Sequence, residues 1–148
     1  MSLAILLDSG PLGLFVHPRR PQELVRRLDS WGRAGATLCV PEISYYEVRR
    51  ELRRLDLVVS TNRLAAAAQS LTYLPITTAI IVRASELWAD VRRAGRPSAD
   101  AAALDGDVIL AATAIELEGQ FDEVVVVTTN LRHLEQLVRA VRWDEFSS

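Results

Sequence analysis

The sequence predicts a three-layer α/β/α sandwich with a mostly parallel central sheet, formed by all 148 residues as a single domain. Short, continuous apolar runs, such as Leu3–Leu7 and Val124–Val127, are typical of strands buried on both faces of a parallel sheet. Segments with apolar residues at helical spacing separate these runs, as the crossovers between parallel strands require. No repeat, low-complexity tract or long linker divides the chain.

The first half of the chain alternates apolar runs with helical patterns. Leu3–Leu7 predicts a strand that stops before a glycine and a proline. Gln22–Arg33 has the periodicity of an amphipathic helix. A second buried strand is predicted over Thr37–Val40, and the pattern of Glu42–Leu55 predicts the helix that follows it.

The middle of the chain is mainly helical. Thr61–Leu71 is rich in alanine and predicts a helix, and Ile80–Arg93 predicts a longer one. Between them, Leu71–Ile76 predicts a short strand, which Pro75 confines to the edge of the sheet. A break is expected at Gly95–Ser98.

The last third contains the clearest strand. An alanine-rich loop is expected to lead to Asp105 and Asp107, which would begin a helix over Val108–Leu117 that is apolar on nearly every face and therefore buried. The β-branched run Val124–Val127 predicts a central strand. A short helix over Leu131–Arg139 and a last strand at Val141–Trp143 complete the predicted fold.

The basic residues are all arginine. The formal charge is −2, and all 17 basic residues are arginines, several of them in adjacent pairs. Arginine suits bidentate contacts to phosphate, although the pairs by themselves favour ordinary solvated helix faces in a protein whose GC-rich gene uses arginine codons. Cys39 lies in an apolar run, which favours a buried thiol in a reducing compartment. Without a secretory signal pattern or a membrane-length apolar run, we expect a cytoplasmic protein.

Carboxylates follow the predicted strands at one edge of the sheet. Parallel strands bring their carboxyl ends together, so Asp8 and the segments after Val40 and Val127 are expected to meet there. The acids that could converge on Asp8 are Glu47, Asp100, Asp105 and Asp107. Because like charges repel, the simplest arrangement has a divalent ion between them, and hard oxygen ligands suit Mg²⁺ or Mn²⁺.

Each acid also has a purely structural interpretation. Asp8 could cap the turn that follows it, and Glu47 could be a solvated charge on its helix. Asp105 and Asp107 would suit a helix N-terminus. Ser9 and either Thr128 or Thr129 are hydroxyls that could orient the carboxylates or a metal-bound water.

Several classes of enzyme lack their motifs in this sequence. Two histidines, His17 and His133, are too few for a histidine-based metal site. No second aspartate follows Asp8 at the spacing used by aspartyl-phosphate phosphatases. Glycine-rich dinucleotide or phosphate loops and serine or cysteine hydrolase elbows are also missing.

Four segments in chain order carry a more specific pattern: Leu7–Ser9, Pro41–Val48, Asp105–Ala114 and Val126–Leu134. The first segment has an acid after a strand, the second an acid on the next helix, the third an acid before an alanine-rich helix, and the fourth a strand ending in Thr-Thr-Asn. In this order the segments resemble those of a PIN domain, and particularly those of the VapC-type toxin ribonucleases. The likeness spans almost the whole chain. One departure follows Asn130, where the family usually has an acid before an aromatic residue and this chain has His133 and Leu134.

The resemblance implies a Mg²⁺- or Mn²⁺-dependent endoribonuclease that leaves a 5′-phosphate. Asp8, Glu47 and Asp107 match the family's catalytic, metal-binding acids; additional candidates are Asp105, Ser9, Thr128 and Asn130. The resemblance also implies an antitoxin partner and a homodimer. The candidate RNA-binding side chains, nearest to Glu47 in sequence, are Arg49, Arg50, Arg53 and Arg54.

Two other functions fit the same residues. The missing fourth acid is compatible with a non-catalytic PIN-like module that binds protein or RNA. The acids alone are also compatible with a metal-dependent phosphohydrolase that acts on a small substrate and needs no basic groove.

Overall fold

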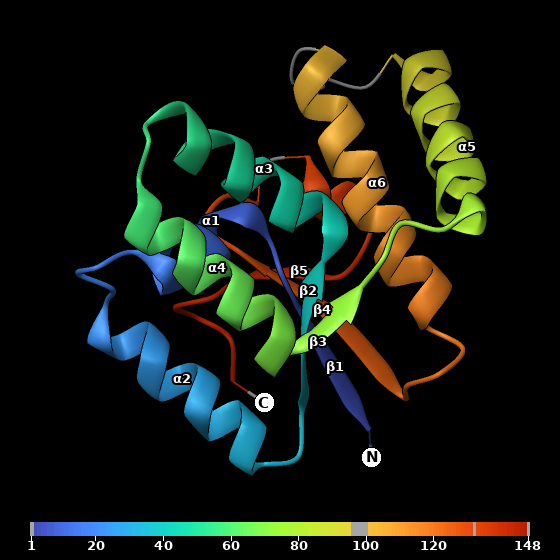
Figure 1. Ribbon diagram of the computed structural model, residues 1–148. Coiled ribbons are helices and arrows are strands. Elements are labelled where there is room, and N and C mark those ends of the chain that lie inside the picture. Colours follow the sequence, from blue (N-terminus) through green and yellow to red (C-terminus); the bar gives the residue numbers. More distant parts are fainter. Residues whose placement is uncertain (1, 96–100, 132, 148) are drawn as a thin grey trace.

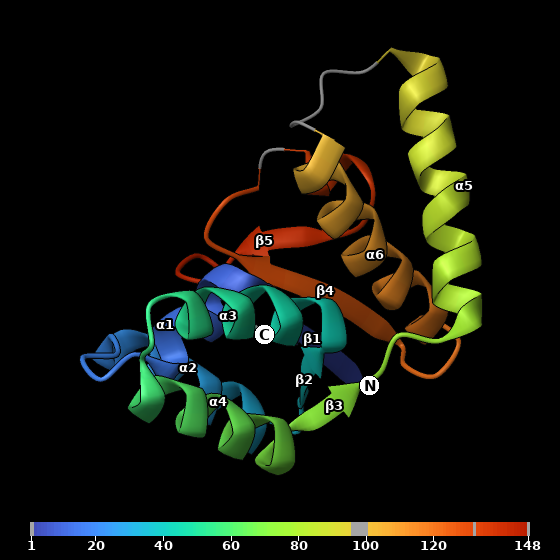
Figure 2. The ribbon, with the colours of Figure 1, turned by 45° about the horizontal axis from the view of Figure 1, so that its top comes forward.

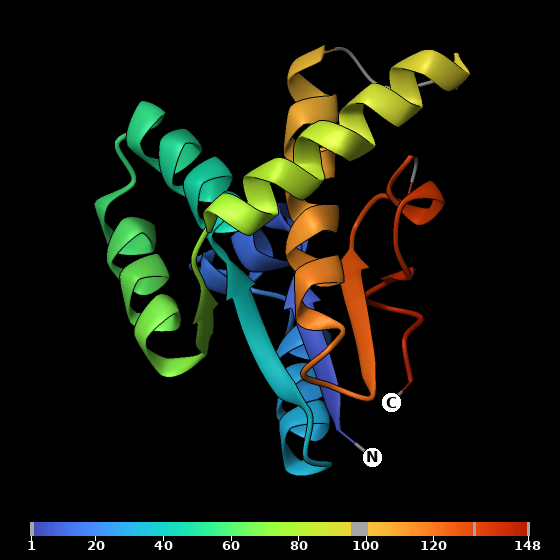
Figure 3. The same ribbon diagram turned by 90° about the vertical axis from the view of Figure 1, so that its right-hand side faces the viewer.

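A five-stranded parallel sheet forms the centre of the molecule. The structure is a computed structural model that describes residues 2–95, 101–131 and 133–147. The strands lie in the order β3-β2-β1-β4-β5, and every neighbouring pair is parallel. In Figure 3 the arrowheads of β1, β2, β3 and β4 point the same way. They are β1 (Leu3–Leu7), β2 (Thr37–Pro41), β3 (Thr72–Leu74), β4 (Glu123–Thr128) and β5 (Ala140–Arg142). The predicted parallel sheet and the edge position of β3 are therefore confirmed.

Helices cover both faces of the sheet (Figure 1). The described residues form α1 (Ser9–Val16), α2 (Gln22–Arg33), α3 (Glu42–Arg54), α4 (Val58–Ser70), α5 (Thr78–Ala94), α6 (Ala101–Leu117) and the single-turn 3₁₀ helix η1 (Leu134–Gln136). Side chains of α1, α2 and α4 pack on one face and those of α6 on the other. α5 packs on α6 and is the outermost helix on that side (Figure 2). The result is the predicted three-layer α/β/α arrangement.

Alternate residues of the central strands build the two cores. In β1, Ile5 and Leu7 face the layer of α1, α2 and α4, whereas Ala4 and Leu6 face α6, and all four are fully buried. The alternation of side chains along a strand explains why a continuous apolar run is needed here. Cys39 of β2 is also buried, and this burial raises the pKa of its thiol to about 12. The prediction of a buried thiol is confirmed.

Helix α1 was not predicted. Gly10 and Pro11 were interpreted as the end of the strand, but α1 begins at Ser9, immediately after β1. Pro11 occupies the first turn, where a missing backbone N–H costs nothing because it would have no helical partner. The carboxylate of Asp8 caps this helix by accepting a hydrogen bond from the backbone N–H of Ser9 at 2.7 Å. The strand therefore leads directly into a helix, and Asp8 lies at the junction.

Two C-terminal elements also differ from the prediction. α6 begins at Ala101, so the predicted alanine-rich loop is the first turn of the helix, as the helix propensity of alanine favours. The short helix predicted over Leu131–Arg139 is reduced to η1. The backbone carbonyl of Arg139 accepts a hydrogen bond from Val126 in β4, so the chain must already be extended there. The predicted break at 95–98 is confirmed as far as Gly95, the left-handed C-cap of α5; residues 96–98 lie outside the described ranges.

Glu42 joins α3 to the edge of the sheet, and its removal should destabilise the fold. Its carboxylate accepts hydrogen bonds from Tyr73 Oη at 2.6 Å and from the backbone N–H of Ile76 at 3.0 Å. We expect Glu42→Ala to lower the free energy of unfolding by about 2–3 kcal/mol, because two donors to one charged group lose their partner. Urea denaturation measures this. Tyr73→Phe, which removes one of the two bonds, should cost about 1 kcal/mol; an equal cost for both variants would contradict the assignment.

Candidate active site

The order in which strands are added to the sheet reverses between β1 and β4. The chain leaves β1 toward β2 and β3 on one side, then returns across the sheet through α5 and α6 to β4 on the other side. Open α/β sheets hold their ligands in the crevice beyond the carboxyl ends of the strands at such a point. The register pairs Leu7 with Val127, so Asp8 and Thr128 are neighbours at this edge.

Asp8 is held rigidly at the edge. Its carboxylate accepts one hydrogen bond from the backbone N–H of Ser9 and another, 2.7 Å long, from the hydroxyl of Thr128. The backbone N–H of Asp8 continues the sheet by bonding to the carbonyl of Val127 at 3.1 Å. The capping role considered from the sequence is therefore real, and it does not exclude a functional one, because the cap fixes the position of the carboxylate.

Glu47 approaches the same site from α3. Its side chain is 25% exposed, and Arg50 Nη2 lies 3.9 Å from its Oε2. A Cβ atom placed on Gly106 of α6 would lie only 2.8 Å from that same Oε2, so the carboxylate lies against the backbone of α6. Glu47 is thus turned toward the other acids and is only partly a solvated helix charge.

Asp107 lies within α6 rather than at its start. Because the helix begins at Ala101, Asp107 falls in the second turn, and an N-terminal capping role is excluded. Asp107 and Glu47 line the same cavity, so the side of α6 that carries Asp107 faces α3. Helix capping therefore does not explain the acid at position 107.

One cavity of about 260 Å³ collects the three acids. Its walls come from the ends of β1 and β4, from α3 and α6, and from the loop that leads to η1. The described residues that line it are Asp8, Ser9, Gly10, Glu47, Ala103, Asp107, Thr128, Thr129, Asn130, Leu131, His133 and Leu134. Asp8, Glu47, Asp107, Ser9, Thr128 and Asn130, all candidates from the sequence, are therefore brought together.

Other candidate residues lie elsewhere. Asp105 lines a separate, mainly apolar cavity between α5 and α6, because two residues along a helix turn the side chain about 200°. Asp100 lies outside the described residues. Of the four candidate arginines, Arg50 lines a groove between α1 and α3 that adjoins the acid cavity and shares Ser9, Gly10 and Glu47 with it. Arg54 pairs with Glu51, and Arg49 and Arg53 line neither of these two spaces.

Burial, together with the charge of Asp8 on the other two, raises the pKa values of the three acids. Burial raises the pKa of Asp8, against the hydrogen bonds from Thr128 and Ser9, which lower it. Burial and the charge of Asp8 raise the pKa of Asp107 to about 6. The pKa of Glu47 is also raised, first by burial and then by Asp8, with Arg50 acting in the opposite direction. Negative charge in this cavity is therefore under-compensated by the protein's own groups.

The donor set fits a hard divalent cation. Three carboxylates from β1, α3 and α6 supply the oxygen ligands that Mg²⁺ and Mn²⁺ prefer. Within residues 2–95, 101–131 and 133–147, no three Asp, Glu, His or Cys side chains already lie close enough to hold an ion. The case for a divalent cation therefore rests on the carboxylate oxygens that Mg²⁺ and Mn²⁺ prefer and on the cavity that the three acids share.

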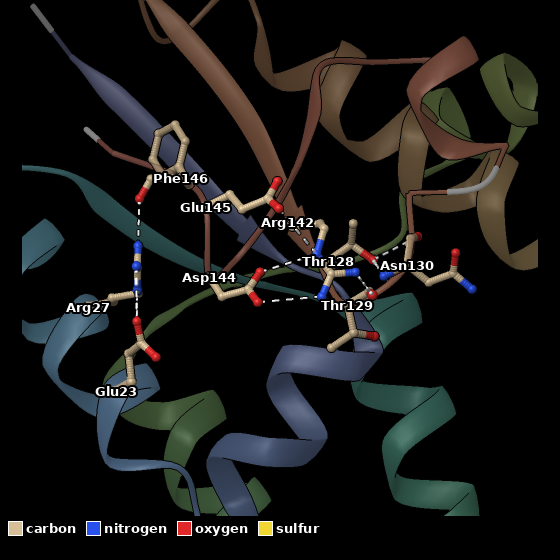
Figure 4. Close-up of polar contacts among 9 residues, drawn as sticks. All are labelled: Glu23, Arg27, Thr128, Thr129, Asn130, Arg142, Asp144, Glu145 and Phe146. Atoms are coloured by element: carbon tan, nitrogen blue, oxygen red, sulfur yellow. Dashed lines mark hydrogen bonds and ion pairs between the residues drawn. The ribbon is translucent and has the colours of Figure 1, made fainter.

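Arg142 braces the loop that closes the cavity (Figure 4). From the end of β5, its Nη1 donates a hydrogen bond of 3.1 Å to the carbonyl of Thr129, and its other nitrogens contact the carboxylate of Asp144 at 3.3 and 3.4 Å. The backbone N–H of Asn130 bonds to the hydroxyl of Thr128 at 3.1 Å. These contacts hold the segment after β4 in place, and a Cβ atom on Gly10 would collide with Thr129.

Sequence reasoning missed three contributors to the site. His133 was set aside because a histidine-based metal site was excluded, yet it lines the cavity. Gly106 and Gly10 were not considered, although each allows a close approach, by Glu47 and by Thr129 respectively. The position of His133 in the sequence could have indicated its role, because it follows β4, which pairs with β1, and Asp8 follows β1.

Gly106→Ala should weaken metal binding without destabilising the fold. The added methyl group must displace the carboxylate of Glu47, a flexible group, while alanine stabilises the helix by up to about 1 kcal/mol. We expect an unchanged or higher thermal midpoint and a roughly 10-fold lower affinity for Mn²⁺ by calorimetry, since one of the three candidate ligands would be moved. Gly32→Ala on α2, where the new atom has ordinary contacts, is the control. An Mn²⁺ affinity unaffected by Gly106→Ala would show that Glu47 is not a ligand.

The fold and site define a class: a parallel α/β/α protein with acids from three separate elements around a cavity at the switch point of its sheet. The chain belongs to the PIN domain family, whose model matches residues 5–137. No curated protein sequence matches the chain.

Solved structures share the fold along nearly the whole chain. A VapBC2 complex from Rickettsia felis bound to a promoter DNA fragment matches with a TM-score of 0.76 at 13% identity, covering 95% of this chain and 98% of that one. VapBC-1 from nontypeable Haemophilus influenzae matches with a TM-score of 0.71 at 16% identity, covering 96% and 99%. DNA-bound VapBC from Salmonella typhimurium has a TM-score of 0.69 at 21% identity, covering 95% and 98%. At these identities the likeness is one of fold.

Proposed function

We propose that this protein is a Mg²⁺- or Mn²⁺-dependent endoribonuclease and the toxin of a toxin–antitoxin pair. The observation that carries the proposal is the single cavity lined by Asp8, Glu47 and Asp107, three acids with raised pKa values on three different elements. Membership of the PIN family and the fold shared with the VapBC structures support it.

The three acids have different parts in the proposed reaction. When bound, a divalent ion supplies Lewis-acid stabilisation of the phosphodiester and makes a nearby water more acidic. Asp8, fixed by Ser9 and Thr128, provides a rigid carboxylate ligand, and Glu47 and Asp107 complete the donor set. One of these carboxylates could also accept a proton from the attacking water.

Arginine at the rim would hold the RNA strand. Arg50 is half exposed, stacks over Tyr46 at 5.1 Å and lies in the groove that continues from the acid cavity. A guanidinium there can bind the phosphate next to the scissile one and can partly offset the repulsion between RNA and the acids. The remaining arginines of α3 would contribute a weaker, salt-dependent attraction.

Cleavage of RNA tests the proposal directly. Purified protein should cut labelled single-stranded RNA with Mg²⁺ or Mn²⁺ and should stop when EDTA is added. A hydrolase that acts on small substrates instead should keep its turnover when Arg49, Arg50, Arg53 and Arg54 are replaced by glutamine, whereas a nuclease should weaken and show a smaller salt slope. Cleavage that continues in EDTA would refute the metal-dependent mechanism.

A non-catalytic binding module is the second candidate, favoured by the lack of a ready three-ligand group in the described parts of the chain. It predicts no binding of Mn²⁺ at millimolar concentration in calorimetry. Clear binding that is abolished by Asp107→Asn would exclude this candidate. RNA binding without cleavage, together with no Mn²⁺ binding, would support it.

The proposed partners are a small antitoxin and a second copy of the chain, both acting in the cytoplasm. α5 exposes Ile81, Val82 and Trp88 on the outside of the molecule, an apolar surface of the kind that protein partners cover. None of the described helices is both long and apolar enough to cross a membrane. Light scattering of the isolated chain, and of the chain purified with the product of an adjacent short reading frame, would test both partners.

A further inference from the structure

His133 brings a basic group to the cavity that holds the three acids. It lies in the loop after β4, at the N-cap of η1, whereas the acids come from β1, α3 and α6. The side chain is half-buried. Among the described residues that line the cavity, His133 alone carries a basic side chain. The cavity therefore combines three acidic side chains with one basic side chain.

The imidazole has no hydrogen-bond partner within the described part of the chain. Its interaction with the site is electrostatic: positive charge on His133 lowers the pKa of Asp107, against burial and the charge of Asp8. The other histidine, His17, is exposed, and its Nδ1 accepts a hydrogen bond from the backbone N–H of Arg19 at 3.0 Å. His133 is thus a nitrogen donor placed beside the acids and unused by the fold.

We propose that His133 is a substrate-binding residue that donates a hydrogen bond to a non-bridging oxygen of the phosphodiester lying in the cavity. The inference rests on the proposed nuclease function for the identity of the ligand. It assigns His133 a direct contact with RNA, separate from the binding of the metal by the acids.

A basic donor suits this cavity, because the other side-chain donors among its described lining residues, on Ser9, Thr128, Thr129 and Asn130, are all neutral. Ionised carboxylates only accept hydrogen bonds and repel a phosphate, and the hydroxyl of Thr128 already donates to Asp8. An imidazole keeps at least one N–H in its neutral form and has two when protonated, so the contact does not depend on its protonation state. A donor in the same cavity as the acids would help to fix the phosphate there.

The experiment compares His133→Ala and His133→Gln with His17→Ala as the control. RNA affinity is measured with a single-stranded oligonucleotide in Ca²⁺ buffer, with the RNA recovered intact, and Mn²⁺ affinity is measured by calorimetry without RNA. We expect His133→Ala to weaken RNA binding about 10-fold, the loss of one hydrogen bond to a charged group. Mn²⁺ affinity and the thermal midpoint should not change. His133→Gln, whose amide retains an N–H donor, should recover most of the RNA affinity.

Three results would overturn the inference. RNA affinity unchanged in His133→Ala removes the contact. A parallel loss of Mn²⁺ affinity would make His133 a metal ligand instead, and a lowered thermal midpoint in both variants, with no rescue by glutamine, would make it structural. Because the chain has two histidines, their imidazole NMR signals provide a readout in the unmodified protein: added RNA should shift that of His133 and leave that of His17 unchanged.

The two proposals fail in different ways. Wild-type protein that binds RNA but never cleaves it contradicts the nuclease, and the role of His133 is then decided by the binding and NMR results. Wild-type protein that does not bind RNA contradicts both.

Discussion

Asp8→Asn should abolish RNA cleavage without destabilising the protein. We expect a loss of at least about 100-fold in rate, because an amide is a poor metal ligand and the most rigidly held carboxylate of the site is lost. Stability should be equal or higher, since burial already raises the pKa of Asp8 and therefore disfavours its charged form. Cleavage of labelled RNA with Mn²⁺ and a thermal melt measure the two effects.

The hydrogen bonds around residue 8 can adapt to the amide. The carbonyl oxygen of asparagine can still accept from Ser9, while its NH₂ group donates to the hydroxyl of Thr128. That hydroxyl can then donate to the carbonyl of Asn130, which lies 3.1 Å away. Asp29→Asn, which removes an exposed acid on α2, is the matched control and should cleave normally. Full activity in Asp8→Asn, with contaminating nuclease excluded, would end the assignment of the site.

Without divalent ions, the protein should lose stability as the pH rises from about 4 to about 6. The pKa of Asp107 is raised from 3.8 to about 6, so in this window the folded state holds a proton that the unfolded chain has released. Fewer protons bound by the unfolded state mean that the free energy of unfolding falls as the pH rises, and this contribution is constant above pH 6. Allowing for solvent screening at a partly exposed group, we expect about 1–2 kcal/mol from Asp107.

Mn²⁺ should reverse this loss near neutral pH. Binding requires ionised carboxylates, so added Mn²⁺ should raise the thermal midpoint clearly at pH 7.5 and much less at pH 5, where protons compete. Melts across this range, with and without Mn²⁺, measure both trends. Asp107→Asn should flatten the metal-free slope and reduce the Mn²⁺ effect. An identical slope in that variant would show that another group is responsible.

Much of the fold was predictable because burial on two faces demands a particular sequence pattern. Strands β1 and β4 have no polar interior residue, and α2 has the predicted bounds of Gln22–Arg33. The elements that were missed or shortened are short. α1 contains glycine and proline, which favour turns in isolation, and η1 is limited to one turn because the chain must enter β5. Local preferences are weak at such lengths, so tertiary contacts decide them.

The sequence was sufficient to place Asp8 at the end of a central strand, and parallel strands leave no choice about the edge at which it lies. It could not decide between Asp105 and Asp107, because their faces depend on where α6 begins and how the helix rotates against the sheet. Nor could it bring His133 to the acids, since that contact joins segments distant in the chain. Strand burial follows from local composition, whereas a site made from four separate elements exists only once packing has fixed their relative orientation.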